Sequence, residues 1–228
     1  MKINSKTIIF LCSGNGGNLR FFYHLIKNGI LKGKLKLIVV ADRQCGALDF
    51  AKIKKLDFYL INFNLKGQLK FLKLAQEINP NLIITTIHKI LIKKVVESLS
   101  DKLVNCHYSI LPSFSGLIGK ETVKKCINYG SKIIGVTVHE VTSELDLGPP
   151  IVQCAFSINS NDKFNDIMNI VFRLGCVSLY TTYCIKCLSK KIMRDNLVTF
   201  DHRRSIISPG LKLPLLFNDE KFWSKIKK

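Results

Sequence analysis

An asparagine and a histidine stand two residues apart at the end of a short apolar run, in the stretch V-N-C-H-Y-S-I-L-P over residues 104–112. Side chains alternate between the two faces of a strand, so we expect Asn105 and His107 on one face and Cys106 on the other. An asparagine amide can donate a hydrogen bond to a developing oxyanion, and an imidazole can stabilise charge and carry a proton. The pair therefore suits a small reacting centre, although the same residue types also form turns at strand ends.

Asp146 supplies a third group, a carboxylate in the acidic loop T-S-E-L-D-L-G-P-P that follows a later strand. A carboxylate beside a histidine favours the charged imidazolium. With Asn105 and His107 it forms a set suited to acyl transfer to an amine. The amine attacks a formyl or acyl carbon, the oxygen gains negative charge, and a proton passes from the attacking nitrogen to the leaving one. This chemistry requires no nucleophilic serine or cysteine, and Cys106 is expected to face away.

A glycine-rich loop, S-G-N-G-G-N over residues 13–18, lies between the apolar run Lys6–Cys12 and a helical pattern. Backbone N–H groups of glycine can approach an anion without a Cβ in the way, and a helix N-terminus adds the positive end of its dipole. The junction is therefore either a phosphate site or a tight turn that requires glycine. It matches neither a nucleotide P-loop nor G-x-G-x-x-G.

Apolar runs of strand length alternate with helical patterns through the first half of the chain, which predicts a parallel sheet covered on both faces. Later strands over 133–141 and 151–158, with a long apolar helix over 162–188, predict a mixed continuation. The fold class expected is α/β: a Rossmann-like, doubly wound, mostly parallel sheet with an antiparallel extension. In such sheets ligands bind beyond the carboxyl ends of the strands. The predicted strands of the first half are Lys6–Cys12, Leu35–Ala41, 58–61 and Leu82–Thr86, and its helices are 19–26, 47–56 and 66–78.

The 228 residues suffice for one large domain, and hydrophobic residues, 47% of the total, are spread along the whole length. That composition excludes wholesale disorder. We expect one domain over residues 1–195 and an irregular basic C-terminal tail over residues 196–228. The apolar runs are too short to span a bilayer and the first residues lack a signal-peptide cleavage pattern, so no membrane association and a cytoplasmic location are predicted.

A net charge of +19, from 35 Lys and Arg against 16 Asp and Glu, would suit a polyanion. The lysines are scattered and are not interleaved with aromatic residues, so nucleic acid is not the predicted partner, whereas phosphorylated or carboxylate-bearing small molecules are.

Several of the eight cysteines lie in apolar runs, which indicates free thiols in a reducing compartment. Cys184 and Cys187 have a metal-like spacing, but no second pair or histidine is near, so no metal site is predicted.

The order of the motifs S-G-N-G-G-N-L, N-C-H-Y-S-I-L-P-S-F and G-V-T-V-H-E-V-T-S-E-L-D-L-G-P resembles that of the folate-dependent formyltransferases over residues 6–160, with weaker similarity to about residue 190. The Asn-x-His-x-Ser-x-Leu-Pro pattern is specific to this superfamily, and the glycine loop is similar to that of the branch acting on glycinamide ribonucleotide. The resemblance implies the formyltransferase fold. It also implies transfer of a formyl group from 10-formyltetrahydrofolate, as co-substrate, to the amine of N1-(5-phosphoribosyl)glycinamide in de novo purine biosynthesis.

The resemblance further implies roles for individual residues. Asn105, His107 and Asp146 would be the catalytic set, and Gly16, Gly17 and Asn18 would bind the ribonucleotide phosphate. Ser109 and Gly116 are assigned to loop shape, and His139 to the structure of its strand. The residues implied to line the reduced-folate site are His88, Lys89, Ile90, Leu91, Asn105, Val141, Thr142, Glu144 and Asp146.

Some positions depart from the family pattern. Lys89 replaces an arginine and lacks its planar fork, His88 replaces an apolar residue, and Cys176 falls where the family has a glutamate that helps to hold the ribose. These departures leave the amine open: an amino sugar nucleotide or methionyl-tRNA is the alternative, although the tRNA branch normally carries a C-terminal barrel domain for which too few residues follow residue 190. A non-catalytic basic binding protein on the same fold is a second alternative. The sequence does not predict an oligomeric state.

Overall fold

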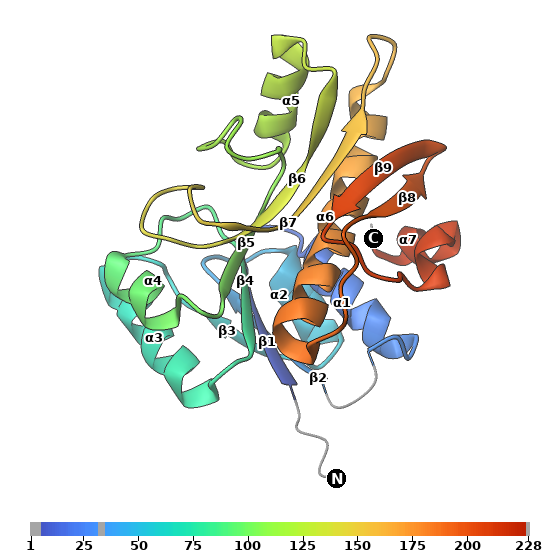
Figure 1. Cartoon of the computed structure of the whole chain (residues 1–228). Coiled ribbons are helices and arrows are strands. Elements are labelled where there is room, and N and C mark those ends of the chain that lie inside the picture. Colours follow the sequence, from blue (N-terminus) through green and yellow to red (C-terminus); the bar gives the residue numbers. More distant parts are fainter. Residues whose placement is uncertain (1–5, 32–34, 227–228) are drawn as a thin grey trace. The chain divides into compact units, whose positions relative to one another are not determined.

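The computed structural model describes residues 6–31 and 35–226. The chain divides into two compact units, one formed by Met1–Val104 with Asp219–Lys228 and the other by Asn105–Asn218 (Figure 1). The boundary falls within strand β5 (Leu103–His107), so this strand begins in the first unit and ends in the second.

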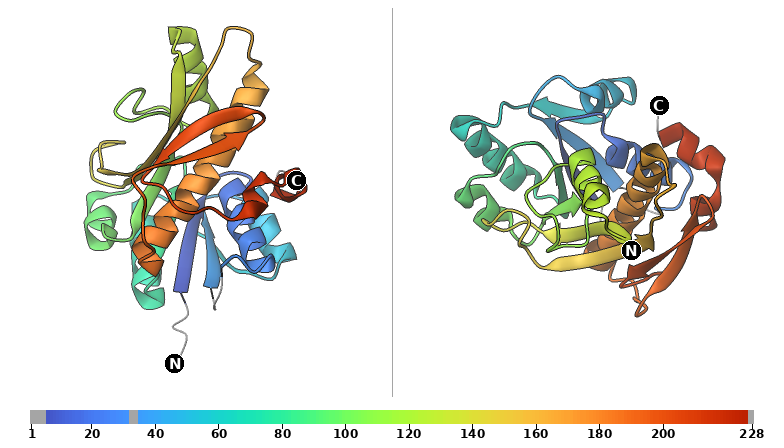
Figure 2. Two further views of the ribbon diagram at one scale, coloured as in Figure 1. Left: turned by 45° about the vertical axis from the view of Figure 1, so that its right-hand side comes forward. Right: turned by 90° about the horizontal axis from the view of Figure 1, so that it is seen from above.

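The first unit is a parallel sheet with the strand order β3-β2-β1-β4. Every residue of β1 from Ile8 to Cys12 is apolar and buried, as expected of a central strand covered on both faces. The chain runs outward from β1 to β3 and then returns to β4, so right-handed crossovers place α1 and α2 on one face and α3 and α4 on the other (Figure 2). The elements are β1 (Lys6–Cys12), α1 (Gly17–Lys27), β2 (Leu35–Ala41), α2 (Gly46–Ile53), β3 (Asp57–Leu60), α3 (Leu65–Ile78), β4 (Leu82–Thr86), α4 (Lys93–Leu99) and α7 (Glu220–Ile226).

The last helix, α7, is part of the core of the first unit. Trp223 stacks on Phe21 of α1, with ring centroids 5.6 Å apart and planes inclined by 9°. Phe222 meets the same ring edge-on at 5.9 Å. All three side chains are almost completely buried, so helix α7 is held in place by apolar burial.

Trp223→Ala should therefore destabilise the first unit, by about 3–5 kcal/mol, the usual cost of truncating a buried aromatic residue. Urea unfolding followed by circular dichroism measures the change as a lower transition midpoint. Lys221→Ala, at an exposed position of the same helix, is the control and should leave the midpoint unchanged. A wild-type midpoint for the tryptophan variant would show that α7 contributes no stability.

The second unit contains antiparallel strands in the order β6-β7-β9-β8, with α6 packed on β6 and β7. Helix α6 is long and apolar enough to cross a membrane, but 78% of its most apolar window is buried inside the protein, as in the core helix of a globular fold. The elements are α5 (Lys120–Tyr129), β6 (Ile133–Glu140), β7 (Pro150–Ser157), α6 (Phe164–Leu188), β8 (Asn196–Phe200), β9 (Arg203–Ser208) and the 3-10 helix η1 (Leu215–Asn218).

The predicted α/β fold class is confirmed, with parallel strands in the first unit and antiparallel strands in the second. The prediction of irregular structure for residues 196–228 is wrong, because β8 and β9 form a hairpin and η1 and α7 follow. Asp201 and His202 make its two-residue turn with φ values of 48° and 62°. The hairpin is anchored by polar contacts, since Arg203 pairs with Asp162 and Asn169 of α6 donates to Asp201. A domain boundary at residue 195 stays a prediction.

Candidate active site

Strand β5 ends at His107, and its side chains take the alternation expected of a strand. Asn105 is partly exposed and His107 is buried. Cys106 faces α6, because its Sγ lies 3.2 Å from the position that a Cβ on Gly175 would occupy. Burial raises the pKa of the Cys106 thiol well above its ordinary value, so the thiol stays protonated and is a poor nucleophile.

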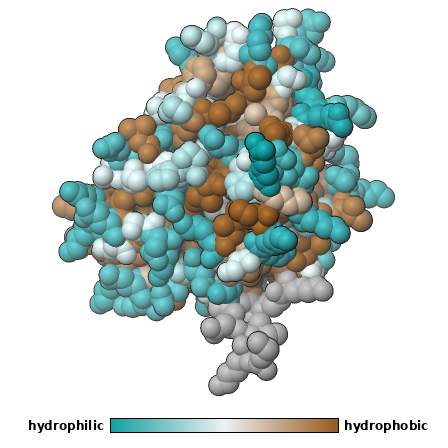
Figure 3. Space-filling view, viewed as in Figure 1, coloured by the Kyte–Doolittle hydropathy of each residue, from teal (hydrophilic) through white to brown (hydrophobic). Residues whose placement is uncertain are grey.

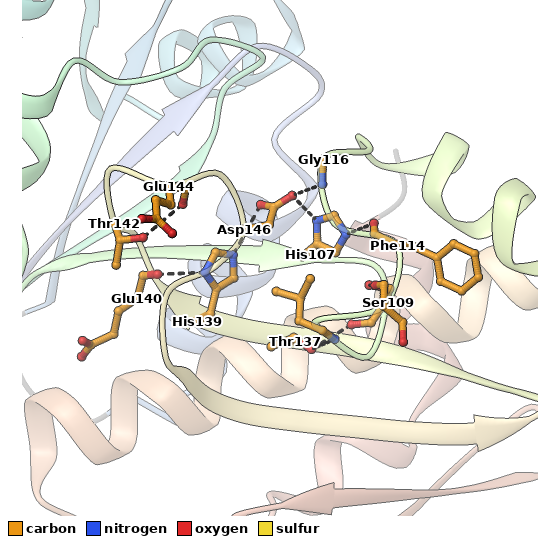
Figure 4. Close-up of polar contacts among 12 residues, drawn as sticks. His107, Ser109, Phe114, Gly116, Thr137, His139, Glu140, Thr142, Glu144 and Asp146 are labelled. Atoms are coloured by element: carbon orange, nitrogen blue, oxygen red, sulfur yellow. Dashed lines mark hydrogen bonds and ion pairs between the residues drawn. The ribbon is translucent and has the colours of Figure 1, made fainter.

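The carboxylate of Asp146 brings three groups of the second unit together (Figure 4). Its Oδ2 lies 3.3 Å from His107 Nδ1 and accepts a hydrogen bond of 2.8 Å from the Gly116 N–H. Its Oδ1 lies 3.7 Å from His139 Nε2. The side chain is only 10% exposed, so these contacts are weakly screened by water. Asp146 itself has φ 57°, a left-handed conformation uncommon outside glycine, and such residues cluster at functional sites.

His107 is held at both ring nitrogens. Nδ1 faces Asp146, and Nε2 lies 3.0 Å from the backbone oxygen of Phe114. A carboxylate and a carbonyl oxygen only accept hydrogen bonds, so a proton on each nitrogen satisfies both contacts. The geometry thus accommodates a proton on each ring nitrogen, one directed at Asp146 and the other at the Phe114 oxygen.

A network around the Thr137 hydroxyl fixes the loop that follows His107. Thr137 Oγ1 donates to the Ser109 oxygen at 2.8 Å and accepts from the Leu111 N–H at 3.0 Å. Gln153 Nε2 donates to the Leu111 oxygen at 3.0 Å, and Ser109 Oγ donates to the Ser113 oxygen at 2.5 Å. Ser109 therefore shapes the loop, as expected. Neither Thr137 nor Gln153 was predicted, because each lies on a distant strand and joins the loop only in the fold.

Thr137→Val should lower both stability and turnover. Valine keeps the shape but leaves the buried Leu111 N–H without its acceptor, at a cost of about 1–3 kcal/mol. Urea unfolding and a steady-state assay measure the two effects. Thr199→Val, the same change at an exposed position of β8, is the matched control and should change neither. If the two variants had the same stability and the same turnover, the Thr137 hydroxyl would not be what supports the loop.

The glycine loop of the first unit has the predicted strand, loop and helix order. Gly16 precedes α1 with φ 69°, and a Cβ there would lie 2.8 Å from the Cβ of Ala47, so glycine is required for both conformation and space. Gly17 and Asn18 open α1, where backbone N–H groups point out of the helix end. The Arg20 side chain donates to the Asn15 oxygen at 3.1 Å and adds positive charge beside the loop. The arrangement suits an anion, and phosphate binding stays a prediction.

The loop over residues 88–91 follows β4 and lies beside the glycine loop, because the His88 N–H donates to Ser13 Oγ at 2.9 Å. Gln68 of α3, which is buried, holds the loop by donating to the Ile90 oxygen at 3.1 Å and accepting from the Ile92 N–H at 2.7 Å. His88, Lys89 and Ile90 are exposed and Leu91 is buried. Gln68 reads as an ordinary helix residue in the sequence, so its role was not predicted.

The loop over residues 141–146 carries Asp146 at its end. Thr142 and Glu144 are exposed and Val141 is partly buried. The Thr142 hydroxyl donates to the Glu144 oxygen at 3.1 Å, which narrows the loop before Asp146. Contacts of these residues with a folate stay predictions.

All eight cysteines are free thiols. Cys176 is fully buried in α6, so that position offers no side chain to a ribose. Across residues 6–31 and 35–226, no three His, Cys, Asp or Glu side chains gather as a metal site. On the face in Figure 3, hydrophilic side chains are interspersed with apolar ones and do not form one continuous patch.

Residues 6–180 match the protein family described as formyl transferase. The chain belongs to the formyl transferase family. The matched segment contains the glycine loop, the His107–Asp146 contact and most of α6, so both units carry the features of this enzyme family.

Individual relatives agree with this assignment. The phosphoribosylglycinamide formyltransferases of Escherichia coli and Haemophilus influenzae are 27% and 29% identical, over 70% and 71% of this chain and 77% and 78% of theirs. The solved phosphoribosylglycinamide formyltransferase of Coxiella burnetii superposes with a TM-score of 0.74 at 25% identity, covering 88% of this chain and 96% of that one. A methionyl-tRNA formyltransferase of Thermotoga neapolitana is 28% identical over 69% of this chain, but this chain covers only 48% of it.

Proposed function

We propose that this protein transfers the formyl group of 10-formyltetrahydrofolate to the amine of N1-(5-phosphoribosyl)glycinamide. The observation that carries the proposal is the contact of 3.3 Å between Asp146 Oδ2 and His107 Nδ1 at the end of the strand that also bears Asn105. In a member of the formyl transferase family, this set has the chemistry that formyl transfer to an amine requires.

In the proposed reaction the amine nitrogen attacks the formyl carbon, a new carbon–nitrogen bond forms, and the formyl oxygen becomes an oxyanion. The Asn105 amide donates to that oxygen, and the His107 imidazolium stabilises its charge. His107 Nε2 exchanges the Phe114 oxygen for the substrates and donates its proton to N10 of the folate. The oxyanion then reforms the carbonyl as the bond from the formyl carbon to N10 breaks, and the electron pair of that bond stays on N10. The neutral imidazole accepts the surplus proton of the attacking nitrogen, which restores the imidazolium that Asp146 stabilises.

The first unit offers groups that suit the remainder of both substrates. The loop of Gly16, Gly17 and Asn18, with the α1 N-terminus and the nearby Arg20, suits the ribonucleotide phosphate. The exposed residues from His88 to Ile90, on a loop held by Gln68, suit a reduced folate. In the second unit, the exposed residues Thr142 and Glu144 precede Asp146 and have polar side chains that suit a reduced folate.

The proposal is tested by incubating the purified protein with 10-formyltetrahydrofolate and phosphoribosylglycinamide, following tetrahydrofolate formation and weighing the product. Formylated ribonucleotide is the expected result. If turnover occurred only with an amino sugar nucleotide or with methionyl-tRNA, phosphoribosylglycinamide would not be the substrate, but the formyl-transfer reaction would still hold. Absence of turnover with all three amines, together with salt-sensitive binding of nucleic acid, would support a non-catalytic binding protein instead. Because both proposed substrates are small water-soluble molecules, we propose a cytoplasmic location.

A further inference from the structure

His139, on β6, borders the carboxylate of Asp146 and is 2% exposed. Its Nδ1 lies 2.8 Å from the backbone oxygen of Glu140. Its Nε2 is buried and, among the residues that the structure describes, has no hydrogen-bond partner. The nearest polar contact of Nε2 is Asp146 Oδ1 at 3.7 Å (Figure 4).

The carbonyl oxygen of Glu140 fixes the tautomer of His139. A carbonyl only accepts, so Nδ1 carries the proton, and in the neutral ring Nε2 then presents a lone pair toward Asp146. Burial lowers the pKa of His139 and the nearby His107 lowers it further, against the opposing effects of the Glu140 carbonyl and of Asp146. In the neutral ring two acceptors therefore face each other across 3.7 Å, and a proton that Nε2 takes up from solvent turns the gap into a charge-assisted hydrogen bond to Oδ1.

The other contacts of Asp146 explain why the separation between its Oδ1 and His139 Nε2 matters for His107. Oδ2 is taken by His107 and by the Gly116 N–H, whereas Oδ1 faces His139. Rotation of the carboxylate would exchange the two oxygens and draw Oδ2 away from His107. A group that holds Oδ1 thus opposes this rotation together with the Gly116 N–H, which holds Oδ2. Among the residues that the structure describes, Asp146 and His107 are the charged groups that act on His139, whereas Lys186 of α6 is paired with the Glu140 carboxylate.

We propose that His139 is a positioning residue of the site, whose Nε2 holds Oδ1 of Asp146 through a shared proton and so keeps Oδ2 on His107. This inference rests on the proposed roles of His107 and Asp146. It assigns to His139 more than the structural role expected from the sequence, where a histidine on a buried strand gave no sign of its neighbour.

Two conservative variants separate the nitrogens of His139. The amide nitrogen of His139→Gln can take the place of Nε2 and donate to Asp146, while that of His139→Asn can take the place of Nδ1 and donate to Glu140. We expect the glutamine variant to retain most of the wild-type kcat. We expect the asparagine variant to lose on the order of 10- to 100-fold in kcat with little change in either KM, the effect of a misplaced catalytic group. If the kcat of His139→Asn equalled or exceeded that of His139→Gln, the proposal would be overturned and His139 would be a structural residue.

A second readout does not depend on turnover. Nitrogen NMR of the histidine side chains, of which the chain has five, distinguishes the tautomers, and the His139 signal is the one lost in His139→Gln. The proposal predicts a proton on Nδ1 and a clear change at Nε2 in Asp146→Asn. An Nε2 that carries no proton in the wild-type enzyme, or no response to Asp146→Asn, would overturn it. Wild-type kcat in His107→Ala would instead overturn the proposed function, whatever the result at His139.

Discussion

His107→Ala should lower kcat by on the order of 10²- to 10⁴-fold, the usual contribution of a positioned acid and base. The variant loses both the group that carries the proton and the cation that Asp146 stabilises. The fold should persist, because the network of Thr137, Ser109 and Leu111 holds the following loop without His107. Steady-state kinetics with both substrates, beside a circular dichroism melt, measures the two outcomes.

His24→Ala is the matched control for this substitution. His24 lies on α1 in the first unit, away from the candidate catalytic residues in sequence, and is only partly buried. The His24→Ala variant should turn over its substrates at about the wild-type rate. If His107→Ala did the same while remaining folded, His107 would have no part in the mechanism.

Asn105→Ala should lower kcat by about 10²- to 10³-fold, the loss seen when one oxyanion donor is removed. Asn105→Asp keeps the size of the side chain but replaces the donor with a negative charge, so its loss should be at least as large. The oxyanion exists only after attack, so the effect should fall on kcat more than on KM. Initial rates over a grid of both substrate concentrations separate the two constants.

The same isosteric change at Asn81 controls for the loss of an amide. Asn81 Oδ1 accepts from the Thr7 N–H at 2.9 Å, and an aspartate oxygen can accept in the same place. Asn81→Asp should therefore keep the wild-type kcat. An Asn105→Asp variant as active as Asn81→Asp would mean that Asn105 does not stabilise the oxyanion.

The strands that are buried on both faces of the sheet were predictable from the sequence. The elements that form only through tertiary contacts with other parts of the chain were not. The continuous apolar run of β1 and the glycine loop after it have no competing interpretation. Helix α4 has seven residues and buries only three, too few to show a helical period. The β8–β9 turn uses Asp201 and His202, without the glycine that usually marks such a turn. Helix α7 reads as part of a basic tail until Trp223 meets Phe21.

The candidate site divides in the same way. Alternation along one strand placed Asn105 and His107 together, since that relation is local. Asp146 was added to them for its residue type, a carboxylate that suits a histidine, and the resemblance implied the same set. Its approach to His107 depends on the left-handed conformation that it adopts in a long loop. The Gly116 N–H and His139 Nε2 contact Asp146 through tertiary structure alone. No residue type or spacing in the sequence records these contacts.

The central claim is that the formyl group passes directly from folate to the amine of the ribonucleotide. The most direct measurement uses 10-formyltetrahydrofolate with a deuterium atom on the formyl carbon, mixed with the enzyme and phosphoribosylglycinamide in a single turnover and analysed by mass spectrometry. The deuterated formyl group should appear on the ribonucleotide amine, with one tetrahydrofolate released for each product formed. Deuterium recovered as formate, or retained on the folate while the ribonucleotide stays unmodified, would contradict the claim.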